Sequence, residues 1–447
     1  MMRPAVPVRW FVYLIAIGAT LVAAPAAQTV RWPSFRGEQA RGIGEGAALP
    51  LRWNAATGAG IAWRVPIRGL SHASPIVWDD RVYVLSALGQ GSTLDRTAQG
   101  VVFATDTVRH EWTLTCIDLA TGAVRWTRAI HTGTPRQARH VRGTYANATP
   151  VTDGRTIVVS IANEGLFGLD MDGARKWHVP MAPDAPDASL DPASSPVIVD
   201  DLAIVQNDWR AQGFAAAYEL ATGRERWRVE RREGLAWATP GVWRPSGQPA
   251  QVVFNSPRWI RGHEAATGVE RWRIDNAVAS PWDRVPTPVP SGDLLVVGGG
   301  GTEGPLLAIR ASARGELSTT PSAEGTLAWR QDRSASYLPT PLVHEGLVYV
   351  VGDTGIVTVY RERDGSRAAR VRLAADAGTI SASPVAAGGR IYVASQDGDL
   401  FVHAAGESFT PLARNAMGEA MFATPAIAGG RLIVRTVDAV YAIGATR

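Results

Sequence analysis

The chain has 447 residues, of which 46% are apolar and 19% are charged, with 46 glycines and 29 prolines. This composition suits many short strands joined by tight turns better than long surface helices, and it predicts an all-β protein. The net charge of +4 comes from arginines scattered along the chain, with Lys176 as the only lysine, so no basic tract supports nucleic-acid binding.

The first 27 residues have the three parts of a secretory signal peptide. Arg3 and Arg9 come first, an apolar run extends from Trp10 to about Ala24, and small residues at 24–26 offer a cleavage site. The apolar run is shorter than the roughly 20 residues that a bilayer span needs, although retention as an uncleaved anchor is the alternative. We therefore predict export to the periplasm or beyond the cell, with no transmembrane span after cleavage.

Residues 28–53 form an N-terminal extension, and the repeated part of the chain covers residues 54–447. Within it Ser or Thr is followed by Pro and a strand-like run at eight places, namely Pro75, Pro150, Pro196, Pro240, Pro288, Pro341, Pro384 and Pro425. Five of the seven intervals between these prolines are close to the ~40–50 residues of a four-stranded propeller blade. Because proline has no N–H to donate, it belongs at strand starts or sheet edges, so we expect these strands to line a central channel.

A tryptophan recurs in the outer part of the repeat, four residues after a turn glycine. The pairs are Gly122 with Trp126, Gly173 with Trp177, Gly223 with Trp227, Gly268 with Trp272 and Gly325 with Trp329. Glycine permits positive φ at the turn, and the indole on the following strand can pack against the neighbouring sheet while its N–H reaches a carbonyl. We therefore expect these tryptophans to be buried between blades.

The eighth repeat ends at Gly444 without a tryptophan strand. Residues 54–67 hold a turn and a tryptophan strand, with Trp63, that no earlier strands precede. We therefore predict an eight-bladed β-propeller of four-stranded antiparallel blades, in which this N-terminal strand joins the last blade and closes the ring.

The segments "DLATGAVRW" (118–126) and "ASPIVWDDRVYVLSA" (73–87) resemble the PQQ-like β-propeller repeat of the quinoprotein superfamily. The resemblance covers nearly everything from Trp32 to Gly444. "WPSFRG" (32–37) and the closing "ATPAIAGGRLIVRT" are similar to exported bacterial propellers of this family that have no assigned activity. A related group, the propeller lipoprotein of outer-membrane protein assembly, shares the eight blades and begins at a lipidated cysteine, whereas Cys116 is the only cysteine in this sequence.

The resemblance implies two functions. One is a dehydrogenase that holds pyrroloquinoline quinone and calcium at the channel mouth and oxidises alcohols or sugars with an aspartate as the base. Enzymes of the alcohol type carry adjacent cysteines, which Cys116 alone cannot supply. Trp282-Asp283 resembles a pair near the catalytic aspartate, but an aspartate beside an arginine, as Asp283 is beside Arg284, is more often a solvated ion pair, so we assign no catalytic residue. No motif supports PQQ with calcium, and no metal-ligand spacing occurs.

The other function is a non-catalytic scaffold that binds a protein or small ligand of the cell envelope. The residues just before each Ser/Thr-Pro differ among repeats, and we expect them to form a ligand site at the channel mouth; the alternative is that they only plug a narrow channel. They are His72, Tyr145, Asn147, Trp237, Trp282, Asp283, Arg284, Tyr337 and Phe422. After a long insertion at residues 89–112 of the first repeat, a short basic loop within residues 131–148 holds Arg136, Arg139 and Arg142. We predict it as a partner-binding loop, and the alternative is a solvated loop with no partner.

Overall fold

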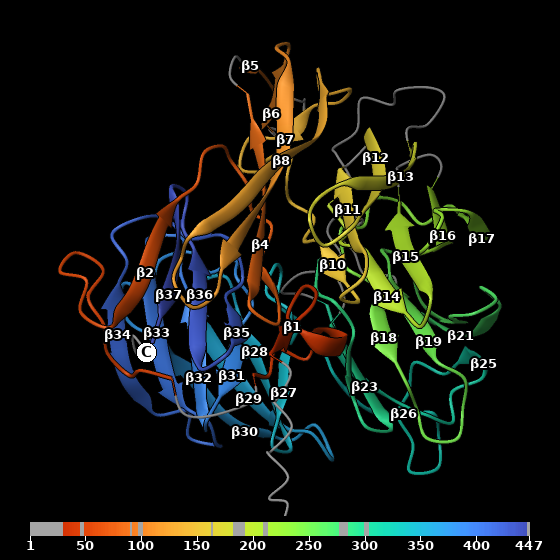
Figure 1. Cartoon of the computed structure of the whole chain (residues 1–447). Helices are drawn as coiled ribbons and strands as arrows, with labels where there is room; N and C mark the ends of the chain where they lie inside the picture. Colours follow the sequence, from red (N-terminus) through yellow and green to blue (C-terminus); the bar gives the residue numbers. More distant parts are fainter. Residues whose placement is uncertain are drawn as a thin grey trace, which may run out of the picture.

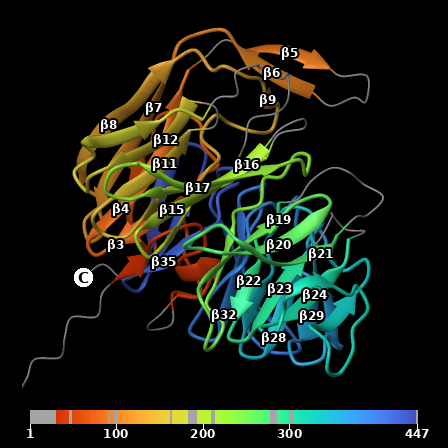
Figure 2. The same ribbon diagram turned by 90° about the vertical axis from the view of Figure 1, so that its right-hand side faces the viewer.

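The computed structural model describes residues 30–44, 49–89, 92–96, 102–161, 164–181, 193–208, 213–276, 285–298 and 304–444. Eight antiparallel blades follow one another around the molecule in sequence order (Figure 1, Figure 2). The predicted all-β, eight-bladed propeller is therefore confirmed. The predicted signal peptide, residues 1–27, lies outside the described residues.

The first four blades run from inner to outer strand in chain order. Blade 1 consists of β3 (Ile76–Trp78), β4 (Arg81–Leu88), β7 (His110–Asp118) and β8 (Val124–Gly133). Blade 2 consists of β10 (Val151–Thr152), β11 (Ile157–Ile161), β12 (Gly165–Leu169) and β13 (Arg175–Val179). Blade 3 consists of β14 (Val197–Val199), β15 (Leu202–Asn207), β16 (Gly213–Glu219) and β17 (Glu225–Arg231). Blade 4 consists of β18 (Gly241–Trp243), β19 (Gln251–Asn255), β20 (Trp259–Glu264) and β21 (Glu270–Asp275).

The next three blades repeat this order. Blade 5 consists of β22 (Val289–Ser291), β23 (Leu294–Gly298), β24 (Leu306–Arg310) and β26 (Leu327–Gln331). Blade 6 consists of β27 (Leu342–His344), β28 (Leu347–Val351), β29 (Ile356–Arg361) and β30 (Arg367–Arg372). Blade 7 consists of β31 (Val385–Ala387), β32 (Arg390–Ala394), β33 (Asp399–Ala404) and β34 (Pro411–Ala416).

The last blade takes its outer strand from the other end of the chain. It consists of β35 (Ala426–Ala428), β36 (Arg431–Arg435), β37 (Ala439–Ile443) and β2 (Ile61–Pro66). β2 pairs antiparallel with β37, with Trp63 opposite Ala442. The inner strand β35 contacts β3 of blade 1 and β31 of blade 7. The N-terminal strand thus occupies the predicted place.

Several further elements lie outside the four-stranded pattern. β1 (Arg31–Trp32) pairs with β3 at the inner edge of blade 1, and the 3-10 helix η1 (Glu38–Ala40) follows it. β25 (Gly315–Leu317) pairs in parallel with β21 at the outer edge of blade 4. The insertion of the first repeat forms a separate sheet of β5 (Ser92–Arg96), β6 (Val102–Asp106) and β9 (Arg139–His140), and its strands β5 and β6 project beyond the blades (Figure 1).

The Ser or Thr of the repeated motif explains why the motif recurs. At six of the eight junctions between successive blades, its backbone N–H donates to the Ser or Thr hydroxyl of the next blade within the described residues. Two such bonds are Thr149 to Ser195 at 2.9 Å and Thr340 to Ser383 at 2.9 Å; the other donors are Ser74, Ser195, Thr287 and Ser383. These buried bonds form a belt around the channel. The proline that follows has no N–H and needs no partner there.

The tryptophans hold the outer parts of the blades together. Trp227 of blade 3 is buried, and its Nε1 donates to the backbone oxygen of Ala265 in blade 4 at 2.9 Å. A Cβ atom on Gly268, whose φ is +73°, would lie 2.7 Å from the Trp227 ring. Glycine is therefore required there both for its backbone angle and for the close approach of the indole. Trp63 and Trp177 make the same contact with the turn of the following blade.

Two tryptophans differ from this pattern. Trp126 is only half-buried, and its Nε1 has no hydrogen-bond partner, so the expectation that every repeat tryptophan is fully buried is wrong for blade 1. Trp272 is buried, but it donates to the Gln251 side chain of its own blade at 2.8 Å. The added strand β25 lies beside β21 and changes the surroundings of this blade.

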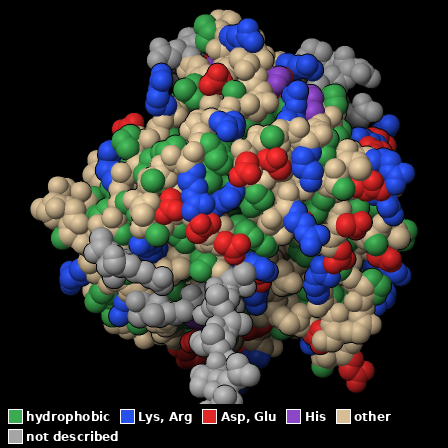
Figure 3. Space-filling model, in the orientation of Figure 1, with side chains coloured by type: hydrophobic (Ala, Val, Ile, Leu, Met, Phe, Trp, Pro, Cys, Tyr) green, Lys and Arg blue, Asp and Glu red, His purple; other side chains and the backbone are tan. Residues whose placement is uncertain are grey.

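Two observations concern the charge of the surface and the described helices. On the face that Figure 3 shows, basic and acidic side chains are intermixed, with no large area of one sign. No helix among the described residues is both long and apolar enough to cross a membrane.

We expect Trp227→Ala to lower the free energy of unfolding by about 3–5 kcal/mol, because it removes a buried indole and its hydrogen bond. Trp126→Ala is the matched control, and it should cost clearly less because that indole is half-buried and unbonded. Urea unfolding of both variants measures the difference. Equal losses would contradict the assignment of the inter-blade contact.

Candidate functional site

The end of the propeller where the Ser/Thr-Pro strands begin holds the candidate residues. Six of the nine lie in the described part of the chain, and Trp282, Asp283 and Arg284 lie outside it. The structure brings His72 and Phe422 together: their rings stack with centroids 4.3 Å apart and planes 14° from parallel. The two residues precede the first strands of blades 1 and 8, which are neighbours only because the ring is closed.

The surroundings of His72 are positively charged. Burial first, and then Arg435 and Arg139, lower the pKa of His72 to about 4, so this side chain is neutral at pH 7. Arg435 is fully buried, and it donates to the backbone oxygen of Leu85 at 2.8 Å and to Ser86 at 3.0 Å. Burial lowers the pKa of Arg435 to about 9, which leaves it charged at pH 7.

The other described candidates differ in their burial and local contacts. Tyr145 is buried, and its hydroxyl donates to the backbone oxygen of Gln137 at 2.9 Å. The Oδ1 atom of Asn147 accepts bonds from the backbone N–H and the hydroxyl of Thr144, so Asn147 shapes the local turn. Trp237 and Tyr337 are half-buried.

The predicted partner loop is partly held against the protein. Arg139 is turned inward, where its guanidinium lies 3.7 Å from Asp106 of β6 and donates to the backbone oxygen of Gly143 at 3.0 Å. Arg136 lies 3.5 Å from Glu164, while its side chain is 59% exposed. Arg142 is exposed. The three arginines therefore face different surroundings, and the loop remains a prediction.

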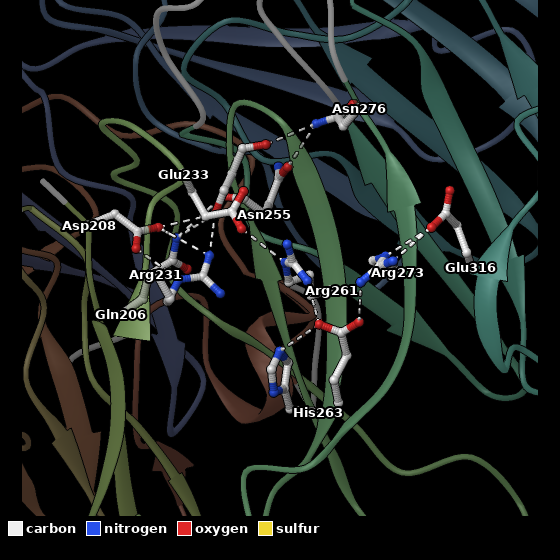
Figure 4. Close-up of polar contacts among 12 residues, drawn as sticks. Gln206, Asp208, Arg231, Glu233, Asn255, Arg261, His263, Arg273, Asn276 and Glu316 are labelled. Carbon is white, nitrogen blue, oxygen red and sulfur yellow. Dashed lines mark hydrogen bonds and ion pairs between the residues drawn. The ribbon is translucent and has the colours of Figure 1, made fainter. Parts of the chain in front are cut away.

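A polar cluster that the sequence analysis did not identify lies between blades 3 and 4 (Figure 4). Asp208 follows β15, and Arg231 ends β17, so both lie where the Ser/Thr-Pro strands begin. Their side chains are 0% and 2% exposed, and they form a bidentate salt bridge, with Nε to Oδ1 at 2.8 Å and Nη2 to Oδ2 at 3.2 Å. Gln206 and Ser256 donate to Oδ2 at 2.7 and 3.1 Å.

An outer set of charges continues this cluster along blade 4. Arg261 lies between two acids: its Nε donates to Glu233 at 2.9 Å, and its Nη1 donates to Glu270. Arg273 of β21 contacts Glu316 of the added strand β25 at 2.8 Å. Figure 4 shows these side chains in a row that leads outward from Asp208. The row borders a groove of about 480 Å³ between β17 and the β20–β21 hairpin.

A comparison of the residues at the ends of the second strands would have found this cluster. The second strands end in Gln206-Asn207-Asp208 in blade 3 and in Asn255-Ser256 in blade 4, whereas that of blade 5 ends in Val297-Gly298. The second strands end at the same face as the prolines. Buried polar side chains at those ends therefore distinguish blades 3 and 4 from a blade with an apolar strand end, such as blade 5.

We expect Arg231→Met to lower the free energy of unfolding by about 3–5 kcal/mol, because it leaves the Asp208 carboxylate buried without its cation. The double variant Arg231→Met with Asp208→Leu should recover part of that loss, since it removes the unpaired charge as well. Chemical unfolding of parent, single and double variants gives both values. A double variant less stable than the single one would contradict the pairing.

Lowering the pH should destabilise the fold through His72. An unfolded histidine takes up a proton near pH 6.5, whereas folded His72 does so only near pH 4, so the unfolded state binds more protons between these values. The contribution of His72 to the free energy of unfolding is therefore complete above pH 6.5. It falls by about 1.4 kcal/mol for each pH unit toward pH 4. Urea unfolding at several pH values should show a shallower fall for His72→Gln, and an unchanged slope would contradict this assignment.

Solved structures of similar fold include BamB and several dehydrogenases. BamB from Moraxella catarrhalis aligns with a TM-score of 0.53 at 16% identity, over 80% of this chain and 97% of that one. A europium-containing methanol dehydrogenase aligns with a TM-score of 0.66 at 12% identity, over 92% and 90% of the two chains. The quinohemoprotein alcohol dehydrogenase from Comamonas testosteroni aligns with a TM-score of 0.60 at 14% identity, over 93% and 81%. These identities show a shared fold alone.

Sequence comparison identifies the family of this chain. No curated protein matches the chain. The family model described as outer membrane protein assembly factor BamB matches residues 96–234, 257–368 and 353–445. These matches span well over half of the sequence and most of the propeller, without residues 54–95 and 235–256, and the chain therefore belongs to the family of PQQ-like β-propellers that this model describes.

Proposed function

We propose that this chain is an exported, non-catalytic binding protein of the cell envelope, in which the propeller is a rigid scaffold for a protein or small-ligand partner. The competing function is a PQQ-dependent dehydrogenase. The family and the fold are common to both, so the choice depends on the residues at the face where the Ser/Thr-Pro strands begin.

The observation that carries the proposal is the state of Asp208. A general base needs a lone pair free to take a proton, and a calcium ligand needs an oxygen free to contact the ion. Oδ1 of Asp208 accepts a bond from Arg231, Oδ2 accepts bonds from Arg231, Gln206 and Ser256, and the side chain is 0% exposed, so neither oxygen faces space that a substrate or an ion could occupy. This carboxylate is thus committed to the packing of blades 3 and 4.

The described residues also do not fit the cofactor set that the enzymes imply. No three His, Cys, Asp or Glu side chains in the described ranges are grouped so that they could hold a metal ion. Cys116 lies buried in β7, where burial raises the pKa of its thiol to about 11. It packs as a small apolar side chain and has no second cysteine in the sequence with which to form a disulfide.

The proposed location in the cell is inferred from the sequence. The order of charged, apolar and small residues over positions 1–27 supports export. Export is in turn compatible with a chain that has no disulfide, because a propeller is held together by the apolar contacts between its blades.

The test is reconstitution of the purified mature protein with PQQ and calcium, with europium as a second metal. We expect no saturable change in PQQ fluorescence and no dye reduction with methanol, ethanol or glucose, while a quinoprotein alcohol dehydrogenase assayed alongside is active. Turnover would establish the dehydrogenase and overturn the proposal. Stoichiometric PQQ binding without turnover would also overturn it in its present form, because it would define a cofactor-carrying protein.

A further inference from the structure

The groove between β17 and the β20–β21 hairpin carries no excess charge. Four arginines and three glutamates line it, and Asp208 neutralises Arg231 from behind. His263, the histidine in the lining, is 2% exposed, and burial lowers its pKa to about 4, so it is neutral at pH 7. A lining of this balance gives no net attraction for an anion or for a cation.

Among the described residues, three buried polar atoms of the lining have no hydrogen-bond partner, although one of them, Nε2 of His263, lies 4.0 Å from Oε2 of Glu270. They are Nη1 of Arg231, Oε2 of Glu233 and Nε2 of His263. The Nδ1 atom of His263 lies 2.8 Å from the backbone oxygen of Gly268, so the proton of the neutral ring is on Nδ1 and Nε2 is an acceptor. The groove therefore offers one vacant donor and two vacant acceptors.

Leaving such atoms unpaired is costly, since a buried polar group without a partner loses about 1–3 kcal/mol relative to a bonded one. A ligand that supplies the partners must both donate and accept. An ionised carboxylate only accepts, an ammonium or guanidinium only donates, and a phosphate adds negative charge. Hydroxyl groups do both without adding charge.

Trp259 adds an apolar surface to this polar set. Its indole lines the groove, and the guanidiniums of Arg258, Arg261 and Arg273 lie 5.0–5.5 Å from the centre of the ring. These contacts hold the ring in place. An aromatic surface beside hydroxyl-binding groups suits a sugar ring, which has apolar C–H faces and a polar edge.

We propose that the groove between blades 3 and 4 binds a neutral saccharide, with the ring against Trp259 and hydroxyls directed to Glu233, His263 and Arg231. The inference rests on the proposed function, because it gives the binding scaffold a class of ligand. The vacant atoms lie beneath the surface of the groove, so hydroxyls reach them when Arg261 turns aside. Its side chain is 20% exposed and bridges Glu233 and Glu270.

The test uses the full mature protein and defined sugars. Maltose, cellobiose and lactose are the neutral probes, and D-glucuronate and inorganic phosphate are the charged comparators, all titrated by isothermal calorimetry. We expect saturable binding of at least one neutral disaccharide and weaker or no binding of the charged compounds. Binding of no neutral sugar at millimolar concentration, or tighter binding of phosphate or glucuronate, overturns the inference.

Two variants place the site in the groove. In Glu233→Gln, an NH₂ group replaces one of the two acceptor oxygens of the carboxylate and the charge is lost, so a sugar hydroxyl loses an acceptor there. We expect this variant to weaken sugar binding at least about tenfold, which corresponds to ~1.4 kcal/mol. Trp259→Ala should weaken it similarly.

The matched control is Glu225→Gln, which changes the same residue type at the far end of β17, where Glu225 pairs with Arg228 outside the groove. It should bind like the parent, and thermal unfolding confirms that each variant is folded. Parent-like binding by both Glu233→Gln and Trp259→Ala would overturn the site. These outcomes are independent of the PQQ assay. Turnover in the PQQ assay would overturn the proposed function, whereas failure of sugar binding would overturn only this inference.

Discussion

The structure depends on a single bond repeated around the channel, from the backbone N–H of one Ser or Thr to the hydroxyl of the next. Each bond joins two blades that have little else in common at their inner ends, where the strands are only two or three residues long. The bond is buried, so breaking it leaves an amide without a partner. Once the inner ends are fixed, the outer ends need only one more attachment, which the tryptophan on the glycine turn provides. Where both contacts occur, a blade is held at both ends of its radius, and the last residues of its second strand are free to vary.

That freedom explains where polar chemistry occurs. The second strands carry apolar residues between the blades, and only their last residues reach the face where the prolines lie. In blades 3 and 4 these last residues are amides, an aspartate and a serine, and Arg231 from the outer strand meets them. The cluster uses positions that the fold does not need for its own closure. Arg435 at the same position in blade 8 donates across to blade 1 instead, so one strand end can serve either for binding or for fastening neighbours.

The amino-acid sequence predicted the repeated features and missed those that arise between repeats. Eight prolines and the orphan strand with Trp63 were sufficient for the number of blades and the closure, because each repeat adopts the same local structure. His72 and Phe422 were both expected at the channel mouth for the same reason, and their rings stack, while a ligand site there stays a prediction. The inward turn of Arg139 could not be predicted, because its partner Asp106 lies 33 positions earlier on a strand of the insertion. To predict the cluster around Asp208, one would likewise need to know how two adjacent sheets pack. The sequence of a single repeat does not contain that information.

The pairing of β2 with β37 also determines the order in which this protein can become folded. These strands are separated by nearly the whole chain, and closing so long a loop is entropically costly, which makes such contacts form late. Until Ala439–Ile443 are available, β2 has no strand to pair with, although Trp63 can contact the turn of blade 1, and any partial fold keeps an open ring with two unpaired edges. Seven blades can assemble progressively by local contacts, but the last step joins the two ends at once. The finished ring should therefore resist opening far more strongly than any arc of blades that precedes it, and its lifetime should be governed by the rate at which this one seam separates.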